Sequence, residues 1–265
     1  MPGSVARMGE TMPLPPESSG ASANPSVPDT HRDRGARILR FDLPERWIHH
    51  SFALLMGVCV VTAAMLYIPQ ISLLVGQRFW VRTVHVGAGL LLLVPLVLGL
   101  VVSSGFRADV RRLSRFSPFD WDWLRPSKRR ERLRGLHVSG QLPLTEPYPV
   151  GKFNAGQKLN ASFTLGATLV MLATGIVLAS SQLWPDQTRT GSTFVHDWVA
   201  LVVVVVAVGH LWRALRDRQA LAGMRTGEVT VDWAVEHHPL WAREVTRNRA
   251  GPGDEPPMSD PPSIL

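Results

Sequence analysis

Apolar residues of this chain gather in four long stretches, separated by segments rich in charge, glycine and proline. The stretches lie at about residues 48–68, 84–105, 159–181 and 194–215. Each reaches the length of about 20 apolar residues that an α-helix needs to cross the hydrocarbon core of a bilayer. The pattern therefore predicts an all-α integral membrane protein built as a bundle of four transmembrane helices.

The two ends of the chain differ from this middle part in composition. Residues 1–36 are rich in Pro, Ser and Gly and lack apolar periodicity, and residues 250–265 are rich in Pro, Asp and Ser. Segments of this composition bury too little apolar surface to offset the entropy lost on folding. We therefore predict disordered tails over residues 1–37 and 246–265, and a membrane domain over residues 38–245.

Positive charge is distributed unevenly between the loops. The link between the second and third stretches is strongly basic, with Arg107, Arg111, Arg112, Arg115, Arg125, Lys128, Arg129, Arg130, Arg132, Arg134, Lys152 and Lys158. The loops after the first and third stretches hold only Arg78, Arg82 and Arg189. Because Lys and Arg accumulate in cytoplasmic loops, both termini and this basic link are expected in the cytoplasm. The net charge of +7 follows the membrane boundary, so no nucleic-acid partner is expected.

Four histidines lie in or at the ends of the apolar stretches: His49, His85, His196 and His210. An ionisable ring is costly in hydrocarbon and therefore indicates a functional residue that faces the bundle interior. Imidazole is also a common axial ligand of haem iron. His196 and His210 are fourteen residues apart, which on a helix gives nearly the same face and a separation of about 21 Å along the axis. One helix with two imidazoles at two depths is typical of a di-haem cytochrome b.

The predicted topology sorts the four histidines by depth. His85 and His196 fall near the outer surface, whereas His49 and His210 fall near the cytoplasmic surface. We therefore predict an outer haem ligated by the first pair and an inner haem ligated by the second. His50 competes with His49 for the inner site, because periodicity does not separate neighbouring residues.

Polar segments around the stretches resemble a known family. They are RFDLPERWIHH at 40–50, GKFNAGQK at 151–158 and GEVTVDWAVEHHPLW at 227–241. With the spacing of His196 and His210, they resemble the cytochrome b (gamma) subunit of respiratory formate dehydrogenase, within the di-haem cytochrome b561 and nickel-hydrogenase cytochrome b family. The resemblance covers roughly residues 38–245 and departs from the family pattern in the tails and in a longer link at 107–150.

The resemblance implies two haems b and menaquinone as the electron acceptor. It also implies two partners at the bacterial cytoplasmic (inner) membrane, an iron–sulfur beta subunit and a catalytic alpha subunit that holds molybdenum or tungsten. Electrons would enter at the outer haem and leave from the inner haem to quinone. This chain has the single cysteine Cys59 and no molybdenum-pterin motif, so formate oxidation would belong to the partner.

The resemblance further implies a quinone site at the loop before the third stretch. Asn154 and Gln157 carry amide donors, and Gly156 allows the backbone to approach a ligand closely. His210 would form a wall of this site in addition to ligating the inner haem. A structural role competes with this interpretation, because Asn154 is also a good N-cap for the third helix. The two roles are compatible.

Other functions remain open from the residues alone. The chain could serve another quinone-linked oxidoreductase, such as a hydrogenase or a thiosulfate reductase. It could also be a stand-alone b561-type electron-transfer protein or a histidine-lined transporter of protons or metal. The adjacent His237 and His238 have no assigned role, and their divergence by about 100° on a helix argues against a shared metal.

Overall fold

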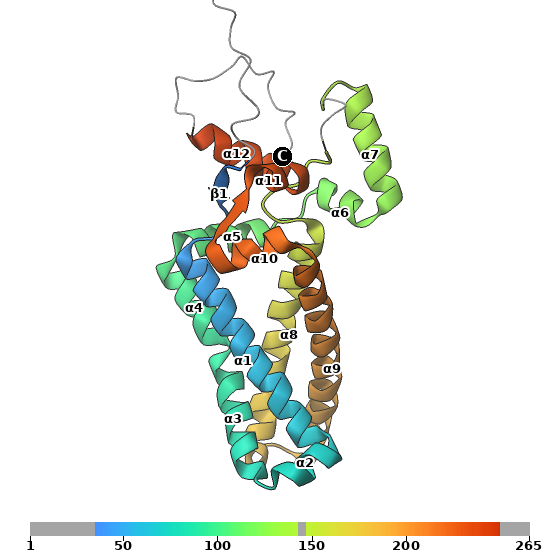
Figure 1. Cartoon of the computed structure of the whole chain (residues 1–265). Helices are drawn as coiled ribbons and strands as arrows, with labels where there is room; N and C mark the ends of the chain where they lie inside the picture. Colours follow the sequence, from blue (N-terminus) through green and yellow to red (C-terminus); the bar gives the residue numbers. More distant parts are fainter. Residues whose placement is uncertain (1–34, 143–146, 250–265) are drawn as a thin grey trace, which may run out of the picture. The chain divides into compact units, whose positions relative to one another are not determined.

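The computed structural model describes residues 35–142 and 147–249, and the structural statements below refer to these residues. Four of its helical segments are long and apolar enough to cross a membrane: α1 (Leu43–Tyr67), the consecutive α3 (Arg78–Leu91) and α4 (Leu93–Val102), α8 (Ala155–Ala179) and α9 (Asp186–Arg216) (Figure 1). The prediction of four membrane-spanning helices is confirmed. The predicted tails lie mostly outside the described residues.

Shorter elements connect and extend these helices. They are β1 (Arg37–Leu39), α2 (Pro69–Val75), α5 (Ser104–Ser114), α6 (Pro118–Leu124), α7 (Pro126–Val138), the 3-10 helix η1 (Ser181–Leu183), α10 (Arg218–Thr226), β2 (Glu228–Thr230), α11 (Val231–His237) and α12 (Pro239–Arg249). The last helix continues past residue 246, where the composition predicted the start of a tail.

The second spanning segment is interrupted at Leu92, which the hydropathy pattern did not predict. Its cause is Pro95, which has no backbone N–H to donate and whose ring crowds the carbonyl of Leu91 one turn earlier. The Leu92 N–H instead bonds to the Gly89 carbonyl at 3.3 Å, in the tighter spacing of a 3-10 turn. The predicted single helix is therefore two helices in sequence, α3 and α4.

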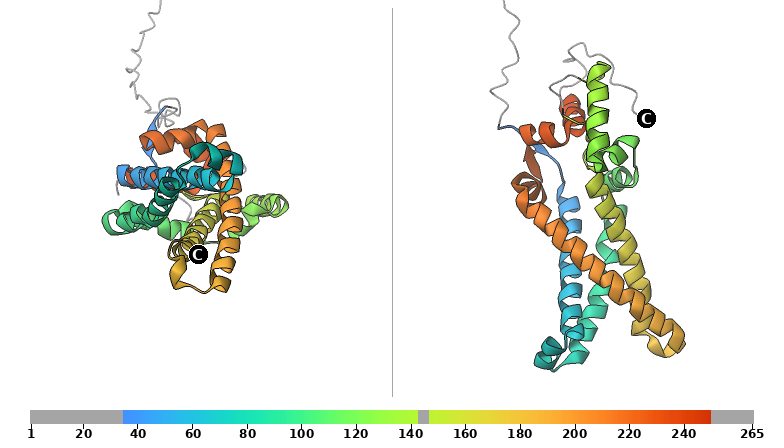
Figure 2. Two further views of the ribbon diagram at one scale, coloured as in Figure 1. Left: turned by 90° about the horizontal axis from the view of Figure 1, so that it is seen from below. Right: turned by 90° about the vertical axis from the view of Figure 1, so that its right-hand side faces the viewer.

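The long helices pack mainly as two pairs. α1 packs along α3 and α4, while α8 packs along α9, as the views in Figure 2 also show. Few of their apolar side chains are buried within the chain, and α9 has no buried residue. Large residues such as Leu201, Val205 and Trp212 are exposed on α9. This exposure is expected of helices whose surroundings are apolar.

A small hydrophobic core outside the four long helices joins the segment before α1 to the segment after α10. β1 and β2 pair antiparallel, with Ile38 opposite Val229. Both side chains are buried against Trp233 of α11 and Trp241 of α12. The all-α prediction omitted this sheet, because strands of three residues are too short to show an alternating pattern.

Gly227 closes the junction between α10 and β2. Its φ of +93° lies in the left-handed region, and an added Cβ would lie 2.6 Å from the Phe41 carbonyl oxygen. Its own carbonyl accepts hydrogen bonds from the N–H groups of Arg40 and Phe41, at 2.7 and 3.1 Å. Glycine is therefore required here both for conformation and for space.

Candidate haem sites and the loop before α8

The structure brings His85 of α3 and His196 of α9 together. Their ring centroids are 6.3 Å apart. The Nδ1 atom of His85 lies 2.9 Å from the Thr62 hydroxyl of α1, and Nδ1 of His196 lies 2.8 Å from the Thr174 hydroxyl of α8. All four spanning segments thus contribute a side chain to this pair.

The two threonines determine how these imidazoles are protonated. Each hydroxyl donates to a carbonyl one turn earlier on its own helix, Thr62 to Val58 at 2.6 Å and Thr174 to Val170 at 2.8 Å. The hydroxyl oxygen therefore accepts a hydrogen bond from Nδ1–H of its histidine. A neutral imidazole with a proton on Nδ1 has its lone pair on Nε2, the arrangement that a metal ligand requires.

The structure also brings His49 of α1 and His210 of α9 together, again with 6.3 Å between ring centroids. His50 has a different environment. Its Nδ1 donates to the Arg46 carbonyl of its own helix at 2.6 Å. Of the two neighbours, His49 is therefore the one whose ring contacts the ring of His210.

Asn154 and Gln157 form a capping box at the start of α8. The Asn154 side-chain oxygen accepts the Gln157 N–H at 2.9 Å, and the Gln157 side-chain oxygen accepts the Asn154 N–H at 3.0 Å. This is the structural role that the sequence offered as an alternative. Both side-chain NH₂ groups remain without a hydrogen-bond partner among the described residues, so they retain two donors each.

The other two residues of the predicted quinone site have separate surroundings. A Cβ on Gly156 would lie 3.3 Å from Asn154 Oδ1 and 3.5 Å from the ring of Trp123 on α6. Within the described chain, no hydrogen bond or ring contact joins His210 to the loop residues Asn154, Gly156 or Gln157.

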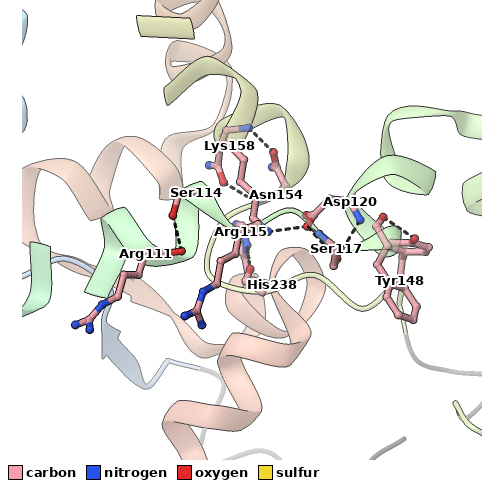
Figure 3. A network of polar contacts seen from close by, with 12 residues as sticks. Arg111, Ser114, Arg115, Ser117, Asp120, Tyr148, Asn154, Lys158 and His238 are labelled. Atoms are coloured by element: carbon pink, nitrogen blue, oxygen red, sulfur yellow. Dashed lines mark hydrogen bonds and ion pairs between the residues drawn. The ribbon is translucent and has the colours of Figure 1, made fainter. Parts of the chain in front are cut away.

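A cavity of about 220 Å³ lies beside this loop, and no motif in the sequence predicted it. Asn154 lines it together with Lys158, whose Nζ lies 2.7 Å from Asp120 Oδ2 (Figure 3). Tyr148 also lines it and donates its hydroxyl to the Phe119 carbonyl at 2.8 Å. Burial raises the pKa of Tyr148 to about 12, so this phenol stays protonated at neutral pH.

A second polar cluster forms around Lys152 of the loop. Lys152 Nζ is 2.6 Å from Asp109 Oδ2 and 3.7 Å from Glu45 Oε1, and all three side chains are buried. Burial raises the pKa of Asp109, against the opposing effect of Lys152. The cluster joins α1, α5 and the loop, which are far apart in sequence, so no local pattern predicted it.

Comparison with known proteins decides the family. A family model described as Prokaryotic cytochrome b561 matches residues 40–227. The chain belongs to the prokaryotic cytochrome b561 family. This match covers α1 to α10, and it includes all four histidines of the two pairs.

Individual relatives match a shorter part of the chain than the family model does. The chain is 31% identical over 104 residues to the cytochrome b556(Fdn) subunit of the nitrate-inducible formate dehydrogenase of Escherichia coli (strain K12), which is 38% of this chain and 48% of that subunit. It is 32% identical over 98 residues to the formate dehydrogenase cytochrome b556 subunit of Haemophilus influenzae, or 36% of this chain and 41% of that subunit. The matched region thus spans about half the length of these relatives or less.

Membership of the cytochrome b561 family confirms the predicted family, haem b as cofactor and a multi-pass membrane protein. The histidine pairs fit this cofactor. An ion that joins two imidazoles through bonds of about 2 Å holds the ring centres about 6 Å apart, close to the 6.3 Å of both pairs. In the described chain, no group of three or more His, Cys, Asp or Glu side chains is placed to hold a metal. Two protein ligands suffice for haem, because its macrocycle provides the remaining ligands.

Two glycines lie beside the outer pair. A Cβ on Gly175 of α8 would lie 3.5 Å from the His196 ring, in ordinary contact. Gly89 follows His85 by one helical turn on the same face, and a Cβ there would have no neighbour within 4 Å. The assignment of individual histidines as iron ligands stays a prediction that this geometry supports.

Proposed function

We propose that this chain is the membrane-anchoring cytochrome b subunit of a formate dehydrogenase complex, with two haems b that pass electrons to menaquinone. The observation that carries the proposal is the pair of histidine contacts on α9. His196 and His210 lie fourteen residues apart on one helix, and each contacts a histidine of a different helix at the same 6.3 Å. The similarity to formate dehydrogenase cytochrome b556 subunits supports the choice of enzyme.

In this proposal, His85 and His196 hold the outer haem, and His49 and His210 hold the inner haem. A bound haem supplies one-electron redox chemistry at its iron. The protein residues fix the position and the electronic properties of each site. Thr62 and Thr174 orient the outer imidazoles and raise their basicity by accepting Nδ1–H, as outer hydrogen-bond partners of metal ligands do.

The quinone is reduced at the loop before α8, in a reaction that consumes two electrons and two protons for each quinol formed. The NH₂ groups of Asn154 and Gln157 donate to a quinone carbonyl oxygen and stabilise the negative charge that builds on it. Their side-chain oxygens are already used in the capping box, so the same two residues begin the helix and present the donors. His210 ligates the inner haem and also forms a wall of this site, and Gly156 allows the backbone to approach the quinone closely.

The orientation follows from the charge distribution. Both termini and the basic link at 107–158 lie in the cytoplasm of a bacterium, and the chain resides in its inner membrane. The membrane domain extends over residues 38–245. The iron–sulfur beta subunit and the molybdenum or tungsten alpha subunit meet the outer ends of the helices, near His85 and His196.

Purification of the chain from its native membrane tests the proposal. We expect it to co-purify with an iron–sulfur subunit and a molybdenum- or tungsten-containing subunit, and formate to reduce b-type haem in the purified complex. Reduction by hydrogen or a failure to co-purify with any dehydrogenase would contradict the assignment to formate dehydrogenase. The first result favours the hydrogenase cytochromes, and the second favours a stand-alone cytochrome b561.

A further inference from the structure

The loop before α8 is held by hydrogen bonds to three consecutive backbone carbonyls. The donors come from the two distant ends of the folded chain: the Leu240 N–H bonds to the Val150 carbonyl at 3.1 Å, His238 Nδ1 to the Gly151 carbonyl at 2.7 Å, and Arg40 Nη2 to the Lys152 carbonyl at 3.0 Å. Asn154 follows two residues later. The position of its side chain therefore depends on segments that precede α1 and follow α11.

His238 links two of these contacts through one neutral ring. Its Nδ1 donates to the Gly151 carbonyl, which leaves Nε2 to accept a hydrogen bond from Arg40 Nη2 at 3.0 Å. The ring is almost completely buried. Burial, and then the charge of Arg40, lower its pKa to about 3, so the ring keeps this donor–acceptor arrangement at neutral pH.

Arg40 is buried to an unusual degree for an arginine, at 4% exposure. It lies over the ring of Trp233 at 4.7 Å and over that of Trp241 at 5.6 Å. Its Nε and Nη1 atoms have no hydrogen-bond partner within the described chain, and burial lowers its pKa to about 10. An unsatisfied buried cation costs stability. At this cost, Arg40 holds a donor in a fixed position for the Lys152 carbonyl and for His238.

We infer that His238, supported by Arg40, is a positioning residue for the quinone loop. It holds the Gly151 carbonyl so that the amide donors of Asn154 and Gln157 meet the quinone carbonyl. The inference rests on the proposed quinone role of that loop. Position matters here, because displacing catalytic groups by about 1 Å can slow a reaction on the order of a hundredfold. The inference assigns a function to His238, which the sequence left without one.

Three variants in the full complex test this inference. His238→Ala removes both ring contacts. His238→Asn restores a side-chain N–H donor near the position of Nδ1. His237→Ala is the matched control, because the neighbouring ring is half-exposed, donates to the Trp233 carbonyl of its own helix at 3.1 Å and stacks on the Trp233 ring. Within the described chain it makes no hydrogen bond to residues 150–158.

We expect His238→Ala to raise the KM for a menaquinone analogue on the order of tenfold, with haem content and reduction of the haems by the upstream donor unchanged. His238→Asn should recover most of the wild-type KM, and His237→Ala should not change it. A KM that stays at the wild-type value in His238→Ala would overturn the inference. So would a failure of His238→Asn to recover it, and this second variant decides the matter if His238→Ala does not assemble.

Amide hydrogen exchange at residues 150–158 separates this inference from the proposed quinone role. Faster exchange in His238→Ala, but not in His237→Ala, is the expected result. Unchanged exchange would show that His238 does not hold the loop and would overturn the inference alone. Faster exchange with normal quinone kinetics would show that the loop is held but is not the quinone site, and it would overturn both.

Discussion

Thr62 and Thr174 occupy equivalent positions around the outer histidine pair. Each hydroxyl donates to a carbonyl of its own helix and accepts from the Nδ1–H of a histidine on another helix. The sequence identified the histidines because an imidazole in an apolar stretch is conspicuous. It did not identify the threonines, since a threonine in a helix ordinarily bonds to its own backbone and needs no partner.

Replacing Thr174 by valine tests this outer hydrogen bond. Valine keeps the size of the side chain but cannot accept Nδ1–H, so the His196 imidazole becomes a weaker electron donor. A weaker donor stabilises the ferric form less, and we expect the reduction potential of the outer haem to rise while that of the inner haem stays constant. Thr168→Val is the control, because among the described residues this buried hydroxyl bonds only to the Thr164 carbonyl, at 2.7 Å. A spectroscopic redox titration distinguishes the two, and equal potentials in both variants would contradict the role of Thr174.

Asn154→Asp and Gln157→Glu separate the two roles of the capping box. Each variant keeps a side-chain oxygen for the cap, and Asp caps a helix as well as Asn does, but each loses its NH₂ donor. We expect both haems to remain bound and reducible, while reoxidation by a menaquinone analogue slows by about 5- to 160-fold, from the loss of a hydrogen bond of about 1–3 kcal/mol. A wild-type rate of reoxidation in both variants would reduce the loop to a helix cap.

At the scale of the elements, α4 and α1 approach each other closely at Gly99. A Cβ at this position would lie 2.5 Å from Cδ1 of Ile48 and 2.8 Å from Cδ1 of Phe106. Ile48 directly precedes His49, so the contact fixes the height and rotation of α1 at the inner pair. Small residues have this role at helix crossings in membranes.

Gly99→Val should therefore weaken the inner haem site selectively. Overpacking of this kind costs about 1–3 kcal/mol, and the side chains of Ile48 and Phe106 must move to relieve it, next to His49. We expect less inner haem and a normal amount of outer haem, measured by low-temperature optical spectra. Gly191→Val is the control, because a Cβ at that position on α9 has no neighbour within 4 Å. Equal loss of both haems would indicate a general folding defect instead.

The elements divide into those that hydropathy predicts and those that it does not. The four spanning segments were predicted because lipid-facing helices expose a nearly continuous apolar surface, which requires a run of about 20 apolar residues in the sequence. The break at Leu92 was missed, since the apolar pattern continues across Pro95 and only the missing N–H interrupts the helix. The β1–β2 pair was missed because its register depends on Ile38 and Val229 meeting from opposite ends of the chain.

In the candidate site, too, the sequence predicted some contacts and not others. The histidine pairing was predicted because depth in a membrane is set by position along a helix, so charge and helical rise together place each ring. The contacts of His238 and Arg40 with the loop were not predictable, because three segments separated by most of the chain converge there. For Asn154 and Gln157, the sequence allowed both roles, and the structure adds that the cap uses only their oxygens.

For the whole molecule, orientation connects the chemistry to the cell. Reporter fusions at residue 187 should indicate the outer face, whereas fusions at residues 130 and 245 should indicate the cytoplasm. The reason is the excess of Lys and Arg in the basic link and around both ends of the membrane domain. The reverse pattern would exchange the faces of the two histidine pairs and place the loop at residues 150–158 on the outer side.

Of the helices in the proposed arrangement, α9 alone supplies a histidine to both pairs and so links the two depths of the membrane. The other two histidines come from α1 and α3 of the opposite helix pair. Binding of haem would therefore connect the two helix pairs, which otherwise share fewer contacts with each other than within themselves. Assembly of the bundle and loading of the cofactor are expected to depend on each other.

Haem content in single histidine variants tests the central claim most directly. The wild-type chain should bind two haems b, and alanine variants at His49, His85, His196 and His210 should each bind one. Redox-resolved spectra should show that His85→Ala and His196→Ala lose the same haem, that His49→Ala and His210→Ala lose the other, and that His50→Ala keeps both. A single haem in the wild type, or loss of the same haem in His85→Ala and His210→Ala, would contradict the proposed pairing.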